Sequence, residues 1–139
     1  MPEEAIETAV RESFARQSFL RTIGAKLIRV APGELDIELP LGEHIRQQSG
    51  FGHAGAVAGI ADTACGYAAL TLMPAGSEVI SVEFKLNLLA PARGETLIAR
   101  GRVVRVGRTL SVCAADVFAD DILVATMLAT MMRVEPRRP

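Results

Sequence analysis

The stretch His53-Ala-Gly-Ala-Val-Ala-Gly-Ile-Ala-Asp62-Thr-Ala-Cys-Gly-Tyr-Ala-Ala-Leu-Thr-Leu72 decides the fold of this protein. Between His53 and Glu78 the sequence holds one charged residue, Asp62, among small and apolar neighbours. A helix that is apolar all round is either enclosed by the rest of the protein or spans a membrane. Because an unpaired carboxylate in such a place is costly, we expect Asp62 to have partners and to take part in chemistry.

A membrane span is the alternative interpretation of residues 54–72, since a span needs about 20 residues. The stretch is rich in Ala and Gly rather than Leu and Phe. An Asp near the centre of a span disfavours insertion by roughly 2.5–3.5 kcal/mol. We therefore favour a helix enclosed by protein and expect no membrane association.

Size and composition indicate a small aliphatic core. The 139 residues make one domain, 1–139. Half of them are hydrophobic and only 4% are aromatic, so the core is built from aliphatic side chains. The net charge is −1 and the basic residues are dispersed, which argues against nucleic acid as a partner.

The two cysteines and the N-terminus indicate a cytoplasmic protein. Cys65 and Cys113 each lie in an apolar segment, which favours buried free thiols in a reducing compartment over a disulfide. The N-terminus is acidic and lacks the apolar core of a signal peptide.

Hydrophobic periodicity predicts two helices and six strands. Apolar residues recur every four positions over 3–17, which is typical of an amphipathic helix, and the long helix of 54–72 ends at Met73-Pro74. A loop covers residues 41–52, and Gly107-Arg108 is a two-residue hairpin turn signal. Alternating or apolar runs predict strands at 25–30, 34–39, 78–89, 96–106, 109–118 and 122–134.

This order of elements predicts an α+β fold. Strands joined by hairpins make an antiparallel sheet, and the fully apolar helix is what that sheet has to wrap. We expect about six antiparallel strands around one long buried helix, with a short helix at the N-terminus. This arrangement resembles the hotdog fold.

The residues around the helix start resemble the acyl-CoA thioesterases of the PaaI (phenylacetyl-CoA thioesterase) type. Those enzymes carry an amide residue, a glycine, then His-Gly-Gly, and an Asp nine residues after the His. The matching positions here are Gln47, Gly50, His53, Ala54, Gly55 and Asp62. The resemblance continues through 81–84 and 89–95 and covers roughly residues 20–134. Ala54 replaces the first glycine after the His, which keeps the backbone N–H but reduces backbone freedom.

The resemblance implies hydrolysis of an acyl-CoA to a free acid and CoA, with no cofactor because CoA is part of the substrate. Thioester hydrolysis places negative charge on the carbonyl oxygen, which N–H groups at a helix N-terminus stabilise. Ala54 and Gly55 begin the helix, so we expect them to donate, with the Gln47 side chain adding an N–H. Asp62 is then the nucleophile or the general base.

Ser81 matches the family position whose hydroxyl orients the acid or its water, with Thr63 as a second candidate. We assign His53, Gly50, Thr63 and Arg108 to substrate binding. His53 is expected to cap the helix or orient its loop rather than act as a base.

Other chemistries have weaker support in the sequence. Arg93 and Lys85 are, with Arg108, candidates for contacts to the CoA phosphates. The His and Cys residues have none of the usual metal-ligand spacings, so we expect no metal. A Ser-His-Asp triad is also disfavoured, because no Gly-x-Ser-x-Gly motif is present.

The distance between donors and acid raises the question of assembly. Asp62 lies nine residues after His53, which is about 13 Å along the helix from the N–H donors at its start. This is too far for one thioester to touch both the donors and the acid in one subunit. In the family's dimers two helices lie side by side, so that the Asp of one subunit faces the helix start of the other. The resemblance therefore implies a shared site, an inactive monomer, and a homodimer that commonly doubles to a tetramer.

Two rival functions on the same fold remain open at this stage. One is an enoyl-CoA hydratase or dehydratase, in which His53 and Asp62 would form the pair of a histidine and an acid that this chemistry requires. The other is a non-catalytic acyl-CoA binding protein. For the acyl group, an aliphatic lining favours a medium or long aliphatic chain over an aryl group.

Overall fold

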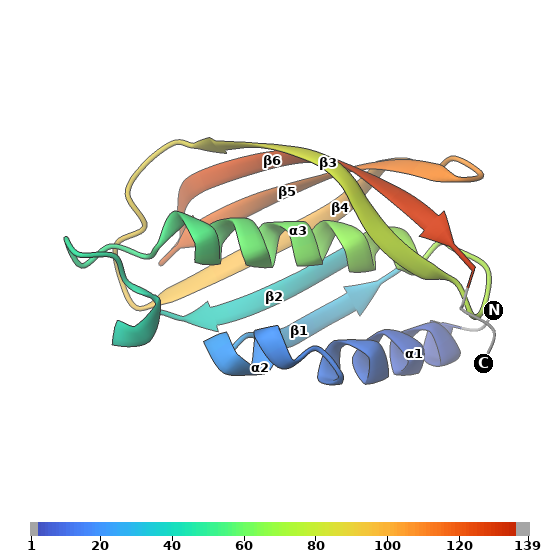
Figure 1. Cartoon of the computed structure of the whole chain (residues 1–139), viewed down its shortest axis with the longest axis horizontal. Helices are drawn as coiled ribbons and strands as arrows, with labels where there is room; N and C mark the ends of the chain where they lie inside the picture. The colour runs from blue at the N-terminus through green and yellow to red at the C-terminus, as the bar shows by residue number, and fades with distance from the viewer. Residues whose placement is uncertain (1–2, 136–139) are drawn as a thin grey trace.

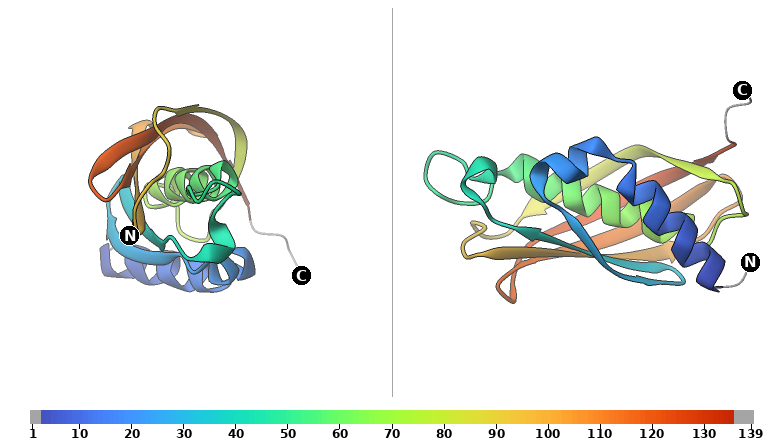
Figure 2. Two further views of the ribbon diagram at one scale, coloured as in Figure 1. Left: turned by 90° about the vertical axis from the view of Figure 1, so that its left-hand side faces the viewer. Right: turned by 90° about the horizontal axis from the view of Figure 1, so that it is seen from below.

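A six-stranded antiparallel sheet curls around one long helix, α3 (Ala54–Leu70), in the computed structural model, which describes residues 3–135 (Figure 1, Figure 2). The strand order is β1-β2-β4-β5-β6-β3, so β1 and β3 are the edges. The strands are β1 (Lys26–Ala31), β2 (Glu34–Pro40), β3 (Glu78–Leu88), β4 (Thr96–Arg105), β5 (Leu110–Ala119) and β6 (Ile122–Val134). The predicted hotdog fold is confirmed.

The helix α3 lies against the concave face of the sheet because every interior strand offers it an apolar row. One glycine permits this close packing. A Cβ at Gly101 in β4 would lie 2.5 Å from the carbonyl oxygen of Ala64, so only glycine lets α3 approach β4 this closely. The buried side chains are mainly aliphatic, as the composition predicted. None of the helices within residues 3–135 is long and apolar enough to cross a membrane.

Two N-terminal helices replace the single one predicted for residues 3–17. The first is α1 (Glu3–Ala15), and the second, α2 (Ser18–Ile23), was missed by the sequence analysis. They follow one another along the edge strand β1, and α1 packs against α3 at the open side of the curled sheet (Figure 1, Figure 2). The six residues of α2 are too few for a periodic signal, but Gly24 at its end is a recognisable C-cap, with φ +87 and its N–H bonded to the Leu20 carbonyl.

The predicted strand ends agree with the structure to within one residue, and three other predicted features differ from it. The long helix ends at Leu70 rather than Leu72, because Thr71 caps it with its hydroxyl on the Ala68 carbonyl. The loop of residues 41–52 contains a short 3-10 helix, η1 (Glu43–Ile45). The two-residue turn at Gly107-Arg108 is wrong: residues 106–109 connect the strands, because a bulge between Val103 and Arg105 shifts the pairing before the turn.

Both cysteines are free and fully buried, as predicted. Burial raises the pKa of the Cys65 thiol, and it raises that of Cys113 to about 11. Since the thiolate is the reactive form, we expect neither thiol of the native protein to react with a chromogenic disulfide reagent at mildly alkaline pH. Both should react once the protein is denatured. A thiol that titrates rapidly in the native protein would contradict this burial.

Candidate active site

His53 organises the start of α3. Its backbone is extended, with φ −65 and ψ 137, and its Nδ1 accepts the Gly55 N–H at 2.8 Å. The His53 carbonyl accepts the N–H groups of Ala56 at 2.9 Å and Val57 at 3.1 Å. The capping role expected for His53 is therefore observed, and it leaves the Ala54 N–H as the one first-turn donor with no acceptor among residues 3–135.

The structure thus separates the two predicted backbone donors. Gly55 already donates to His53, and its residue does not line the adjacent cavity. Ala54 does line that cavity, which has a volume of about 420 Å³ and an otherwise mainly apolar wall that includes Val57 and Leu88. Of these two residues, only Ala54 lines the cavity and has an N–H without an acceptor among residues 3–135.

The Gln47 side chain is fixed through its oxygen, and its Nε2 hydrogens have no acceptor in the part of the chain that the structure describes. Its Oε1 accepts two backbone N–H groups, from Ser49 at 2.5 Å and from Phe51 at 3.2 Å. Gly50, with φ +87, closes this turn by donating its N–H to the Gln47 carbonyl. Because the oxygen is occupied, the Nε2 hydrogens of Gln47 are the donors available in the cavity that it shares with Ala54.

Arg46 orders the loop that carries Gln47, and sequence reasoning missed it. Its Nε donates to the Leu41 carbonyl at 3.1 Å, Nη1 to Gly50 at 2.7 Å and Nη2 to Gly94 at 2.8 Å. One guanidinium thereby ties three segments together immediately before Gln47. An arginine in a long loop that contains glycines can indicate a residue that orders the loop, since the planar guanidinium donates to backbone carbonyls that have no other partner.

Asp62 and Ser81 form the second part of the site. Ser81 Oγ donates to Asp62 Oδ1 at 2.6 Å, and the Asp62 side chain is half-buried. A bulge between Ser81 and Glu83 interrupts the pairing of β3 with β6 directly after the serine. Thr63 uses its hydroxyl proton on the Gly59 carbonyl at 2.7 Å, so it offers only an acceptor to this part of the site.

The two parts of the site face different cavities. Asp62, Thr63 and Ser81 line a cavity of about 550 Å³, whereas Gln47 and Ala54 line the smaller one. Within one subunit the structure therefore does not bring the donors and the acid together. Within residues 3–135, no three His, Cys, Asp or Glu side chains cluster closely enough to hold a metal ion.

The three basic candidates lie in different places. Arg93 stacks over the Phe51 ring at 4.6 Å, beside the cavity of Gln47 and Ala54. Arg108 is exposed in the connection between β4 and β5, at the opposite end of the sheet from the start of α3 (Figure 1). The structure therefore brings Arg93, and not Arg108, near the helix start of its own subunit. Lys85 is exposed on β3.

We expect Ser81→Ala to lower kcat by about ten- to hundredfold with little change in KM. A hydrogen bond to a charged group is worth about 1.5–3 kcal/mol, and about 1.4 kcal/mol corresponds to tenfold in rate. Steady-state kinetics measure the two constants. Ser81→Thr keeps the hydroxyl and is the control that should retain most activity. Equal kcat values for the Ala variant and the wild type would show that this bond does not position Asp62.

A single long helix inside a curled six-stranded antiparallel sheet is the hotdog fold, the fold of hotdog thioesterases. The model of the Thioesterase superfamily matches residues 49–126. This chain belongs to the Thioesterase superfamily and is a thioester hydrolase.

Similar proteins agree with this membership. A thioesterase family protein from Silicibacter pomeroyi has 43% identity and a TM-score of 0.91, with 94% of this chain and 99% of that one covered. The E. coli PaaI protein from the phenylacetic acid degradation operon has the same fold, with a TM-score of 0.87 at 17% identity over 95% of each chain. A protein of Thermoplasma acidophilum that carries the name of an esterase is 29% identical over 73% of this chain and 76% of its own length.

Proposed function

We propose that this protein is a cytoplasmic acyl-CoA thioesterase whose active site is shared between two subunits. The observation that supports this most directly is the division of the site, because Ala54 and Asp62 lie on the same helix but line different cavities. Two copies with their α3 helices side by side and antiparallel would bring Asp62 of each subunit to the helix start of the other.

The chemistry follows from the groups at each end. The thioester carbonyl oxygen accepts the N–H of Ala54 and an Nε2 hydrogen of Gln47, which stabilise the negative charge of the tetrahedral intermediate. Asp62 either takes a proton from the water that adds to the carbonyl carbon or adds to that carbon itself. The C–S bond then breaks, and CoA leaves as a thiolate that takes up a proton. Where Asp62 itself has added to the carbon, water hydrolyses the resulting anhydride, which releases the acid and restores the carboxylate. No cofactor is required, because CoA enters only as part of the substrate.

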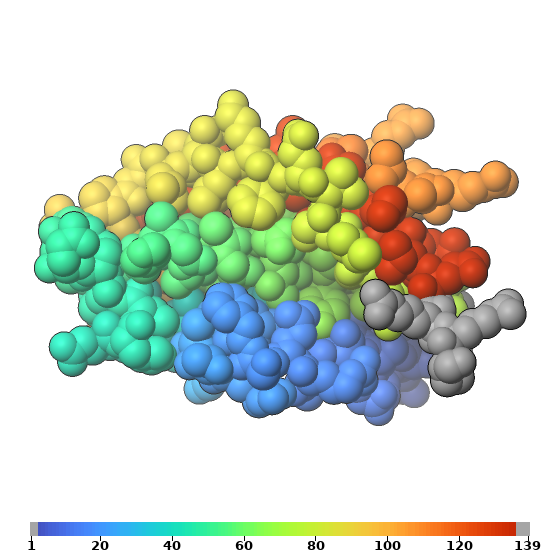
Figure 3. Space-filling model, viewed as in Figure 1, coloured from blue at the N-terminus to red at the C-terminus, as the bar shows by residue number. Residues whose placement is uncertain are grey.

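The edge strand β3 is the proposed dimer contact. Its exposed apolar side chains include Ile80, Val82, Phe84 and Leu88, which are 44–55% accessible. An edge with free backbone groups and apolar side chains is a surface on which a second copy can add. Along the same face, a stripe of α3 remains visible between β3 and the N-terminal helices (Figure 3). Pairing of β3 with its copy would cover both, and two such dimers make the proposed tetramer.

Three assays test the proposal. Release of free thiol from a panel of acyl-CoAs is expected, whereas hydration of an enoyl-CoA is not. Saturable binding of intact acyl-CoA without turnover would instead favour a binding protein. Light scattering at assay concentration should give a dimer or a tetramer, and an active monomer would refute the shared site.

A further inference from the structure

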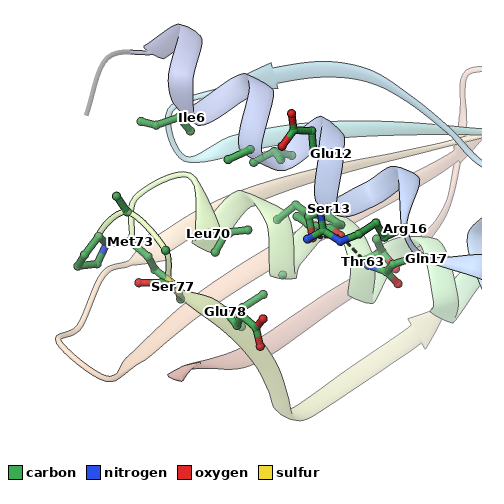
Figure 4. Close-up of a pocket in the computed structure, with 18 of the residues that line it drawn as sticks. Ile6, Glu12, Ser13, Arg16, Gln17, Thr63, Leu70, Met73, Ser77 and Glu78 are labelled. Atoms are coloured by element: carbon green, nitrogen blue, oxygen red, sulfur yellow. Dashed lines mark hydrogen bonds between the residues drawn. The ribbon is translucent and has the colours of Figure 1, made fainter. Parts of the chain in front are cut away.

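The larger cavity runs along the inner side of α1, from Thr63 toward Met73 (Figure 4). Its walls come from α1, from the second half of α3, from residues 73–77 and from the start of β3. Asp62 and Ser81 lie at one end of this set of residues, and Met73 and Pro74 belong to the other. Nothing in the proposed catalytic chemistry uses the far part of this cavity.

The helix α1 is held over this cavity by the Tyr67 hydroxyl. That hydroxyl is bonded to Ser13 Oγ at 2.9 Å and accepts a hydrogen from Gln17 Nε2 at 2.7 Å. The Tyr67 side chain is 3% accessible and packs against the buried Phe14 ring, with the ring centroids 6.1 Å apart. The wall that α1 contributes is therefore anchored to α3.

The polarity of the lining residues changes along the cavity. Near Asp62 it is polar, with Thr63, Ser81 and Gln17, whereas the far end combines apolar side chains with Ser77 and Glu78. The apolar side chains of the far end are only half-buried and present carbon to the empty space: Ile6, Leu70, Met73 and Val79. Exposed charged side chains such as Glu12 and Glu78 complete the lining. A polar end followed by a more apolar end suits a carbonyl group followed by a hydrocarbon tail.

We propose that this cavity is the acyl chamber and that the substrate is a straight-chain aliphatic acyl-CoA of medium length. The inference rests on the proposed function, because it takes the thioester carbonyl to lie at Asp62. The eight residues from Asp62 to Leu70 correspond to about 12 Å along α3, which an extended chain of roughly eight to ten carbons spans. The tail lies against Leu70, Val79 and Met73, with α1 as the outer wall.

Gly66 controls the passage from Asp62 to the far end. It lies one turn beyond Asp62 on α3 and lines the cavity. A Cβ added there would meet Val79 Cγ1 at 3.8 Å and Met131 Sδ at 3.9 Å, which are ordinary contacts. Gly66→Ala should therefore fold normally, with a higher unfolding temperature because Ala favours the helix, while its methyl group takes up room beside the acyl chain.

The test measures binding in the Asp62→Asn background by titration calorimetry, with even-numbered acyl-CoAs from butyryl to dodecanoyl. Affinity should rise about fourfold per methylene up to eight or ten carbons and then stop rising. Adding Gly66→Ala should lower the ratio of octanoyl-CoA to butyryl-CoA affinity by about tenfold or more. Adding Val79→Ala as well removes the facing methyl groups and should restore most of that ratio.

Gly59→Ala is the matched control. It makes the same substitution in the same helix at a residue that lines neither cavity, where the new Cβ would meet only the exposed Phe19 ring, at 3.2 Å. This variant should keep the wild-type chain-length ratio. Phenylacetyl-CoA provides the aryl comparison and should bind more weakly than octanoyl-CoA.

Binding and hydrolysis separate the two proposals. Affinity that is flat across chain lengths, tightest binding of phenylacetyl-CoA, or an unchanged ratio in Gly66→Ala would each overturn the acyl chamber, whatever the wild-type protein hydrolyses. Affinity that rises with chain length as expected, in a wild-type protein that releases no thiol from any acyl-CoA, would support the chamber and refute the proposed thioesterase activity.

Discussion

Asp62→Asn should lower kcat by about 10²–10⁴, the range expected when a general base is lost. Asn has nearly the same shape as Asp, and its amide oxygen can still accept the hydrogen bond from Ser81, which is 2.6 Å from Asp62 Oδ1 in the wild-type protein. The substitution removes only the negatively charged carboxylate, so activity should fall while the fold is retained. Steady-state thiol release measures the loss, and thermal unfolding together with light scattering shows that the variant still folds and assembles.

A variant that keeps more than about a tenth of the wild-type kcat would refute Asp62 as the central catalytic group. Isotope label found in Asp62 would identify it as the nucleophile. In a single turnover in ¹⁸O-labelled water, attack by the carboxylate followed by hydrolysis of the anhydride at the aspartyl carbon puts the label into Asp62 and leaves an unlabelled Asp62 oxygen in the released acid. A general base never acquires label.

Ala54→Pro should lower kcat by about 10²–10³, the usual effect of removing one oxyanion donor. Proline is favoured at the first position of a helix, and it prefers an extended residue before it. Ala54 is that first position, and His53 has φ −65 and ψ 137. Since the Ala54 N–H has no acceptor within residues 3–135, the substitution removes a donor without breaking a bond of the folded protein.

Ala54→Gly is the matched control for this variant. It changes the same side chain but keeps the N–H, so it should retain activity within about threefold if the donor is what matters. Unfolding temperature and oligomeric state complete the comparison. If Ala54→Pro remained folded and as active as Ala54→Gly, the oxyanion would have to be stabilised elsewhere.

The two inactive variants also test whether the site is shared. Refolding Asp62→Asn and Ala54→Pro together in equal amounts makes about half of the dimers mixed, and in each mixed dimer one site combines an intact acid with an intact donor. About a quarter of the wild-type activity should return. No recovery from two dimeric variants would place the whole site in one subunit.

Much of this architecture could be predicted from local pattern. An apolar run such as residues 54–70 has to be buried, and alternating strands of the lengths seen here leave an antiparallel sheet as the partner that can surround it. The spacing of Gln47, His53 and Asp62 likewise indicated the residues of interest. By contrast, α2 and the connection at residues 106–109 depend on a few residues each, where packing and a bulge outweigh local propensity.

The sequence by itself therefore determined the two longer helices, the six strands and the acid that stands alone on the buried helix, because periodicity and charge act within a short stretch of chain. Only the tertiary structure decided which donors are free. The position of the His53 ring decides whether the N–H of Gly55 or that of Ala54 stays available as a donor. The orientation of the Gln47 amide depends on a turn that Arg46 orders. The separation of Asp62 from Ala54 into two cavities depends on how α1, β3 and the loop before α3 pack around the helix. These are contacts between groups distant in sequence, and no local pattern encodes their geometry.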